Sequence, residues 1–203
     1  MNIAEKYINR LKKAYLDNNA EEAWVHFEKI KHGAEKEDIM EIKAKYTSAP
    51  ASLLSLLEYV DGTCWCEYQG EKVAFYFLGS DVDEYRYPYY LFSSEQILRS
   101  KEMPIGEMLA DYIGWLEESG MAVDNKITNN PDTAEWLCFS ECMNGGGTSE
   151  LFIDFTPSTH GKVGQVVRFL HDPDEFKVIA DSFDDYLEML IDNGYVFINE
   201  YST

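Results

Sequence analysis

The sequence predicts an α+β fold, a mostly antiparallel sheet flanked by helices. Two observations lead to this class. Over roughly the first 60 residues, apolar side chains recur every three to four positions, which is typical of amphipathic helices. Beyond them the pattern changes to alternation, which is typical of strands, with helical segments in between. Most of these strands are joined by short turns rich in Gly, Pro and Asp.

Helices are expected first along the chain. The segment 2–17 places Ile3, Tyr7 and Leu11 on one face, so it predicts an amphipathic helix. The leucines after Pro50 are too dense for a solvated face, so that helix is expected to be buried. Gly33 and the pair Asp61-Gly62 are typical helix stops. The expected helices cover 2–17, 21–32, 35–46 and 51–60.

Strands are expected after residue 62. The segment 64–68 alternates, Gln69-Gly70-Glu71 supplies a turn, and 72–79 predicts the returning strand of a hairpin. Further strands are expected at 88–93, 134–144, 149–157, 164–172 and 176–180, with a final edge strand at 195–201. Helices are expected at 95–98, capped by Ser93 and Gln96, at 105–120, and after Ser182, which forms a cap with Asp185.

The pattern indicates one domain over 1–203, in which 1–46 is a helical segment and 47–203 the core. The stretch 125–134 is expected to be an exposed loop, because neither side of it has an independent core. No apolar run approaches the roughly 20 residues that span a bilayer. The first residues are charged and lack the apolar segment of a secretory signal, so we expect a cytoplasmic protein with reduced cysteines.

The net charge of −20 is unevenly placed. Residues 1–46 hold nine acidic and nine basic side chains, whereas 47–203 hold 28 acidic and 8 basic ones, so the excess of 28 − 8 = 20 lies in the core segment. An acidic body repels nucleic-acid phosphates and anionic lipids, which argues against nucleic-acid and membrane binding. It attracts basic proteins, although such a charge can also serve solubility alone.

Four cysteines match the number of ligands in a structural zinc site. Their spacing, Cys64-x-Cys66 and Cys138-x3-Cys142, differs from the usual C-x2-C knuckle. Each pair has even spacing within an expected strand, so both members should face the same side of the sheet. Buried cysteines of a core hairpin are therefore expected, with no metal, no cofactor and no redox centre.

Other catalytic patterns are weak. The loop at Gly145-Gly146-Gly147 has no lysine nearby and a strand after it, so it indicates a hairpin loop and not a phosphate site. The four histidines have no metal-binding or triad spacing. Asp154 lies among apolar strand residues and is expected on the solvent face or capping a turn. No catalytic residue is predicted.

A group of tyrosines and acids after residue 80 favours a protein interface. Tyrosine combines apolar area with a hydrogen-bonding tip, and carboxylates beside it can attract a basic partner. The alternative is that alternate tyrosines belong to a core strand. With the acids near residue 173, the expected partner-binding residues are Asp81, Asp83, Glu84, Tyr85, Tyr87, Asp172, Asp174 and Glu175.

Four stretches together resemble the SUKH superfamily, founded on fungal cell-wall regulators of the SMI/KNR type. They are "PASLLSLLEYVDGT", "VAFYFLGSD", "YPYYLFSSEQI" and "GQVVRFLHDPDEFKVIADSFDDYLEMLIDNG". The similarity extends from about Pro50 to Gly194 and involves structural motifs in their order. It implies a non-enzymatic α+β domain.

Bacterial members of this superfamily are immunity proteins that bind and neutralise a polymorphic toxin, often a nuclease. A nuclease presents a basic cleft, which an acidic inhibitor can occupy. The resemblance therefore implies a non-catalytic immunity protein with a basic toxin as its partner. Two alternatives are a regulatory or scaffold adaptor and, less favoured, a hydrolase. The resemblance supplies no fixed set of binding residues.

Overall fold

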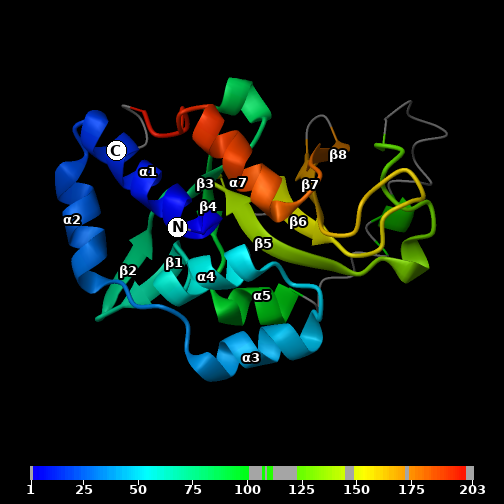
Figure 1. Ribbon diagram of the computed structural model, residues 1–203, viewed down its shortest axis with the longest axis horizontal. Coiled ribbons are helices and arrows are strands. Elements are labelled where there is room, and N and C mark those ends of the chain that lie inside the picture. Colours follow the sequence, from blue (N-terminus) through cyan, green and yellow to red (C-terminus); the bar gives the residue numbers. More distant parts are fainter. Residues whose placement is uncertain are drawn as a thin grey trace.

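The computed structural model describes residues 2–100, 107, 109–111, 123–144, 149–171 and 174–199. The expected helix at 105–120 lies mostly outside the described residues, as do Gly145-Gly146-Gly147 and Asp172. In the described part, four helices precede the first strand, further helices lie among and after the strands, and the strands pair antiparallel, which confirms the predicted α+β fold (Figure 1).

The N-terminal helices are α1 (Ile3–Asp17), α2 (Glu21–Ile30), α3 (Lys36–Lys45) and α4 (Ala51–Tyr59). α1 begins with a capping box, in which Asn2 and Glu5 each accept a hydrogen bond from the other's backbone N–H. α4 buries Leu53, Leu54, Leu56 and Leu57, so its dense leucines do form part of the core. α2 ends at Ile30, slightly before the expected stop.

Among the described residues, six strands form one sheet in chain order, each antiparallel to the next. They are β3 (Leu78–Gly79), β4 (Pro88–Leu91), β5 (Trp136–Cys142), β6 (Ser149–Asp154), β7 (Gln165–Leu170) and β8 (Glu175–Ala180). A separate hairpin precedes them, formed by β1 (Cys64–Tyr68) and β2 (Glu71–Ala74). The remaining elements are η1 (Val82–Tyr85), α5 (Ser94–Ser100), η2 (Pro131–Thr133) and α7 (Phe183–Asp192).

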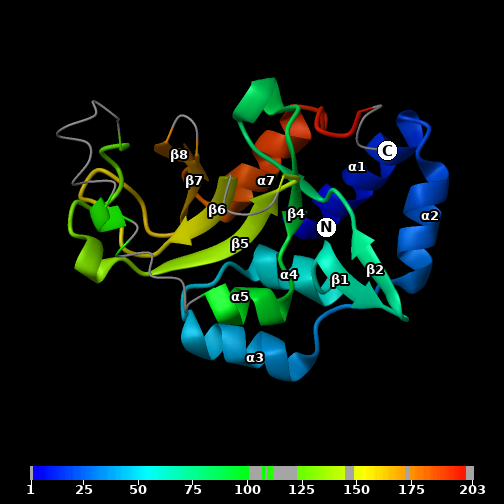
Figure 2. The same ribbon diagram turned by 180° about the vertical axis from the view of Figure 1, so that it is seen from behind.

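The last helix, α7, covers one face of the sheet. The ring centroids of Phe183 and Tyr186 lie 5.2 and 5.7 Å from that of Phe139 on β5. The Tyr186 hydroxyl donates to the Gly79 carbonyl at 2.6 Å, which ties α7 to the edge strand β3. Figure 1 shows α7 in front of the sheet, and Figure 2 shows β5 and β6 in front of α7.

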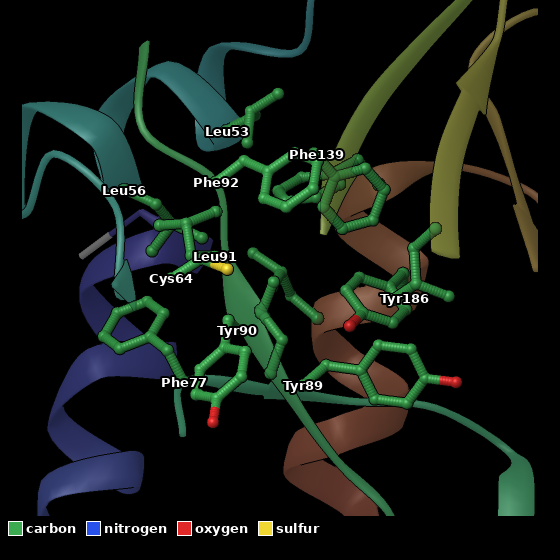
Figure 3. Packing of buried hydrophobic residues seen from close by; sticks show 14 of the residues in the cluster. Leu53, Leu56, Cys64, Phe77, Tyr89, Tyr90, Leu91, Phe92, Phe139 and Tyr186 are labelled. Carbon is green, nitrogen blue, oxygen red and sulfur yellow. The ribbon is translucent and has the colours of Figure 1, made fainter. Parts of the chain in front are cut away.

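Strand β4 sends successive side chains to opposite faces of the sheet. Figure 3 shows Tyr89 on the side of Tyr186, which is the α7 face, and Tyr90 on the side of Cys64. The Tyr89 hydroxyl is hydrogen-bonded to Ser149 Oγ at 2.6 Å within the α7 face. The two tyrosines are therefore core strand residues, and they mark the two faces of the sheet.

The N-terminal helix is attached to the core by tyrosine hydroxyls. Tyr7 donates to the Phe77 carbonyl and Tyr15 to the Tyr76 carbonyl, each at 2.6 Å. From the C-terminal side, Tyr195 donates to the Tyr7 carbonyl at 2.9 Å. A buried hydroxyl that lacks a partner is costly, so these bonds fix how α1 packs.

Two strand predictions were wrong. The expected strand 72–79 divides into β2 and β3, which belong to different sheets, because Phe75 leaves the ladder and stacks on Phe27 at 4.1 Å between ring centroids. The expected edge strand at 195–201 forms turns over its described residues. There Phe197 packs so closely on Gly79 that a Cβ at Gly79 would lie 2.5 Å from its ring.

Candidate protein-binding surface

Three loops lie at one end of the sheet. They join β3 to β4, β5 to β6 and β7 to β8, and in an antiparallel meander every second connection lies at the same end of the strands. Most of the predicted partner-binding residues lie there. We call this surface the acidic loop rim and define it by its described members Asp81, Asp83, Glu84, Tyr85, Tyr87, Asp174 and Glu175. Asp172 lies outside the described residues.

Asp81 is bound internally. It accepts from Arg168 Nε at 2.6 Å and from Lys177 Nζ at 2.6 Å. Only 4% of the Arg168 side chain and 12% of the Asp81 side chain is exposed. Burial alone would raise the pKa of Asp81, but the hydrogen bonds from Lys177 and Arg168 outweigh it and lower that pKa. Asp81 therefore connects the β3–β4 loop to β7 and β8.

Two further carboxylates of the rim have local partners. Glu175 Oε2 accepts from Arg168 Nη2 at 2.5 Å, so one guanidinium joins Asp81 and Glu175. Asp174 Oδ1 lies 2.5 Å from His171 Nδ1 within the β7–β8 turn. The structure thus brings the two groups of predicted acids together, and it does so through a buried arginine that the sequence did not indicate.

The exposed part of the rim has unusual backbone geometry. Asp83, Glu84 and Tyr85 have φ values of 49°, 53° and 68°, in the left-handed region that non-glycine residues rarely adopt. Asp83 and Glu84 are exposed, and Tyr85 is half-buried. Backbone strain of this kind often occurs at functional sites. Tyr87 is half-buried, and its hydroxyl accepts from Asn144 of the β5–β6 loop.

The rim is less negative than its sequence suggests. The rim has five described carboxylates and three cations. The carboxylates are those of Asp81, Asp83, Glu84, Asp174 and Glu175. The cations are Arg86, Arg168 and Lys177. Five minus three leaves two negative charges, without counting His171. Asp83 and Glu84 carry the exposed charge, since Glu84 reaches Arg86 only at 3.3 Å on the surface.

The thiols do not converge. A β-bulge between Cys138 and Ser140 shifts the register of β5, so Cys138 and Cys142 face opposite sides and the prediction that they share a face was wrong. Cys64 Sγ donates to Glu141 Oε1 at 2.8 Å, and burial raises the pKa of Cys66 to about 11. Among the described residues, no group of three or more His, Cys, Asp or Glu side chains is arranged to hold a metal ion.

Asp154 is buried and not on the solvent face, because it is 0% exposed. Its carboxylate accepts from Thr156 N at 2.8 Å and from Gln165 Nε2 at 2.9 Å. The alternative prediction, that Asp154 caps a turn, is therefore the one that the structure confirms. Its hydrogen bonds account for its burial, and it needs no ligand.

A second group of acids was missed by the sequence reasoning. Tyr90, Glu141 and Glu150 are cross-strand neighbours on β4, β5 and β6, on the face opposite α7. Trp65 of β1 lies beside Tyr90, with 6.5 Å between the two ring centroids. We call Trp65, Tyr90, Glu141 and Glu150 the Glu150 stripe. The available signal was an acid at the start of the apolar strand "SELFID", the same signal that singled out Asp154.

The sequence of this chain matches that of a known family. Residues 33–189 match the family model described as SMI1 / KNR4 family (SUKH-1). The chain belongs to this family. The SUKH resemblance of the sequence is thereby confirmed, and the match begins earlier than expected, within the N-terminal helical segment. A comparison with curated proteins gave no match.

In the described part of this SUKH-1 chain, no helix has both the length and the apolar character needed to cross a bilayer.

Proposed function

We propose that this SUKH-1 chain is a non-catalytic immunity protein of the cytoplasm, which binds a basic toxin domain and blocks its active site. Membership of a family that includes immunity proteins supports the class of function. The net charge of −20 supports a basic partner, for which a nuclease toxin is the best candidate, because its substrate is a polyanion. Neither nucleic acid nor a membrane is expected as a partner, since both would be repelled.

The observation that carries this proposal is the charge that remains exposed at the acidic loop rim. Asp83 and Glu84 project from a strained backbone segment, while the buried pair of Asp81 and Arg168 fixes the base of the loop. A loop held in one geometry loses little entropy on binding. Tyr85 and Tyr87 beside the two acids provide amphipathic contact area, as in many protein interfaces.

The test uses the toxin domain encoded nearest to this chain in its own genome. Surface plasmon resonance at low and high salt should show fast association that slows as salt rises. Nuclease assays should show that cleavage stops at one equivalent of this chain. The double variant Asp83→Asn/Glu84→Gln should slow association about tenfold or less, because exposed charges act mainly on the on-rate.

The matched control is Glu21→Gln/Glu22→Gln on α2, which removes the same charge from two exposed positions of the N-terminal segment. It should associate as fast as the unchanged protein. Equal slowing by both double variants would place the effect in the net charge and not in the rim. Absence of a complex at low salt would refute the proposed function.

A further inference from the structure

The carboxylate of Glu150 is buried without compensation. Glu150 is 6% exposed, and no described residue donates a hydrogen bond to it or forms an ion pair with it. Burial, followed by the nearby charge of Glu141, raises the pKa of Glu150 to about 7. A buried carboxylate of this kind is costly unless a donor or a cation accompanies it.

The neighbours of Glu150 add to this cost. Glu141 faces it directly across β5 and β6, and like charges opposite each other destabilise a sheet. The thiols of Cys64 and Cys138 lie near the two acids, and burial keeps both protonated by raising their pKa values. Phe169 is the cross-strand neighbour on β7. No described lysine, arginine or histidine is in ion-pair contact with Glu141 or Glu150.

Aromatic rings continue the row of acids. Trp65 is 61% exposed, although it is a large apolar side chain. The β-bulge between Cys64 and Cys66 places it at φ 56°, and its ring lies beside that of Tyr90. Tyr76 stacks on Tyr90 with 5.3 Å between ring centroids. Aromatic faces, and tryptophan above all, attract cations.

The stripe lies on the face of the sheet opposite α7, and Trp65 is its exposed end, while Tyr90 and Glu150 are buried beside it. α7 packs on the other face, where it contacts Phe139. In Figure 2 this side faces the viewer, with β4, β5 and β6 in front of α7 and with α5 below β5. Of the stripe, Trp65 alone lines the adjoining open pocket of about 390 Å³, whose wall holds the acids Asp61, Glu67 and Glu95 as well as His32 and Arg99.

We infer that the Glu150 stripe is a binding site for an arginine side chain of the protein partner. The guanidinium would stack on Trp65 and form charge-assisted hydrogen bonds with Glu150 and Glu141. Arginine fits better than lysine because its planar group both stacks on aromatic rings and bonds carboxylates in pairs. That the arginine belongs to a toxin rests on the proposed function, whereas the site itself does not.

The experiment separates these two parts by using a peptide in place of the toxin. Acetyl-Gly-Arg-Gly-amide is titrated into the protein at pH 8, and the indole N–H signal of Trp65 is followed by NMR. The same peptide with citrulline in place of arginine keeps the shape and removes the charge. The arginine peptide should shift the Trp65 signal and bind at least fivefold more tightly than the citrulline peptide.

Single substitutions test whether the arginine peptide binds at the Glu150 stripe. Glu150→Gln and Trp65→Ala should each weaken binding of the arginine peptide about fivefold or more, whereas Asp132→Asn, at an exposed acid of η2, should leave it unchanged. At pH 5, where Glu150 holds a proton, the unchanged protein should bind the arginine peptide as weakly as Glu150→Gln does at pH 8. Glu141 and Cys138 are the other titratable groups that face Glu150, and Cys64 is bound to Glu141.

Equal binding of the arginine and citrulline peptides would overturn the inference, and so would unchanged binding by Glu150→Gln. A protein that binds the arginine peptide but no toxin would leave the site standing and refute the proposed function. Conversely, a toxin complex that withstands Glu150→Gln and Trp65→Ala would keep the proposed function and refute the assignment of the bound arginine to the toxin.

Discussion

The acidic loop rim and the Glu150 stripe lie at the same end of the sheet, yet the carboxylates of the rim have cationic partners and those of the stripe do not. In the rim, Arg168 and Lys177 reach Asp81 from the neighbouring strands. In the stripe, Glu141 and Glu150 face each other with no cation among the described residues. Both regions contain a buried carboxylate, but only in the rim does a lysine or arginine neutralise it.

This difference separates structural charge from charge that is available to a partner. An ion pair that is satisfied inside the protein holds loops together and offers little to a ligand. A buried acid without a partner lowers stability, and a ligand that brings a cation recovers that loss. Substitutions in the two regions should therefore have opposite effects on stability.

The largest expected effect is in the rim. Arg168→Met should lower the free energy of unfolding by about 3 to 5 kcal/mol, because it leaves Asp81 buried with Lys177 as its remaining cation. Urea denaturation measures this change. Lys177→Met is the control, since Lys177 is half-exposed and its loss should cost about 1 kcal/mol or less. Similar small losses for both variants would remove the distinction between the regions.

A smaller effect of opposite sign is expected in the stripe. Glu150→Gln should raise the free energy of unfolding by about 2 kcal/mol at pH 8, because the amide removes a buried charge. The gain should shrink as the pH falls and vanish below about pH 4.5, where the folded and the unfolded protein both hold the proton. Denaturation of both proteins from pH 4 to pH 8 tests it, with Asp132→Asn as the exposed control. Destabilisation at pH 8 would mean that Glu150 has a favourable partner.

The sign follows from proton linkage. Burial raises the pKa of Glu150 from 4.5 to about 7, so between these values the folded protein holds a proton that the unfolded chain has released. The stabilisation from this proton is complete below about pH 4.5 and is lost as the pH rises through 7. The unchanged protein should therefore lose stability across this window, and Glu150→Gln should lose less.

The smallest effect is expected at Trp65. Trp65→Ala should change the free energy of unfolding by about 0.5 kcal/mol or less, because the side chain is 61% exposed. Trp24→Ala, at a tryptophan that is 1% exposed, should cost about 3 kcal/mol or more in the same urea titration. A large loss at Trp65 would make it a core residue and would weaken the case for a cation site there.

Several features followed from the sequence. The 3.6-residue repeat located α1 to α4, and apolar segments bounded by turn residues located β4 to β8. The caps at Ser93 and Ser182 were correctly placed, because a hydroxyl and an acceptor three residues later form a local hydrogen-bond pattern. The family resemblance was also carried by the order of such local motifs.

The sites were harder to predict. The acids of the rim were visible as a cluster, but their neutralisation by Arg168 was not, because that arginine lies 87 residues from Asp81 in the chain. The pairing of Glu141 with Glu150 depends on the register of β5, which a bulge shifts by one residue. Cys138 and Cys142 were assigned to one face for the same reason.

The sequence by itself determined the fold class, the family and an excess of carboxylates over cations. These depend on local periodicity, on motif order and on composition, which need no knowledge of distant contacts. Only the tertiary structure decided which carboxylates are paired and which are left for a partner. Ion pairing depends on contacts within a few ångströms between residues that are far apart in the chain, and strand register and bulges set those contacts.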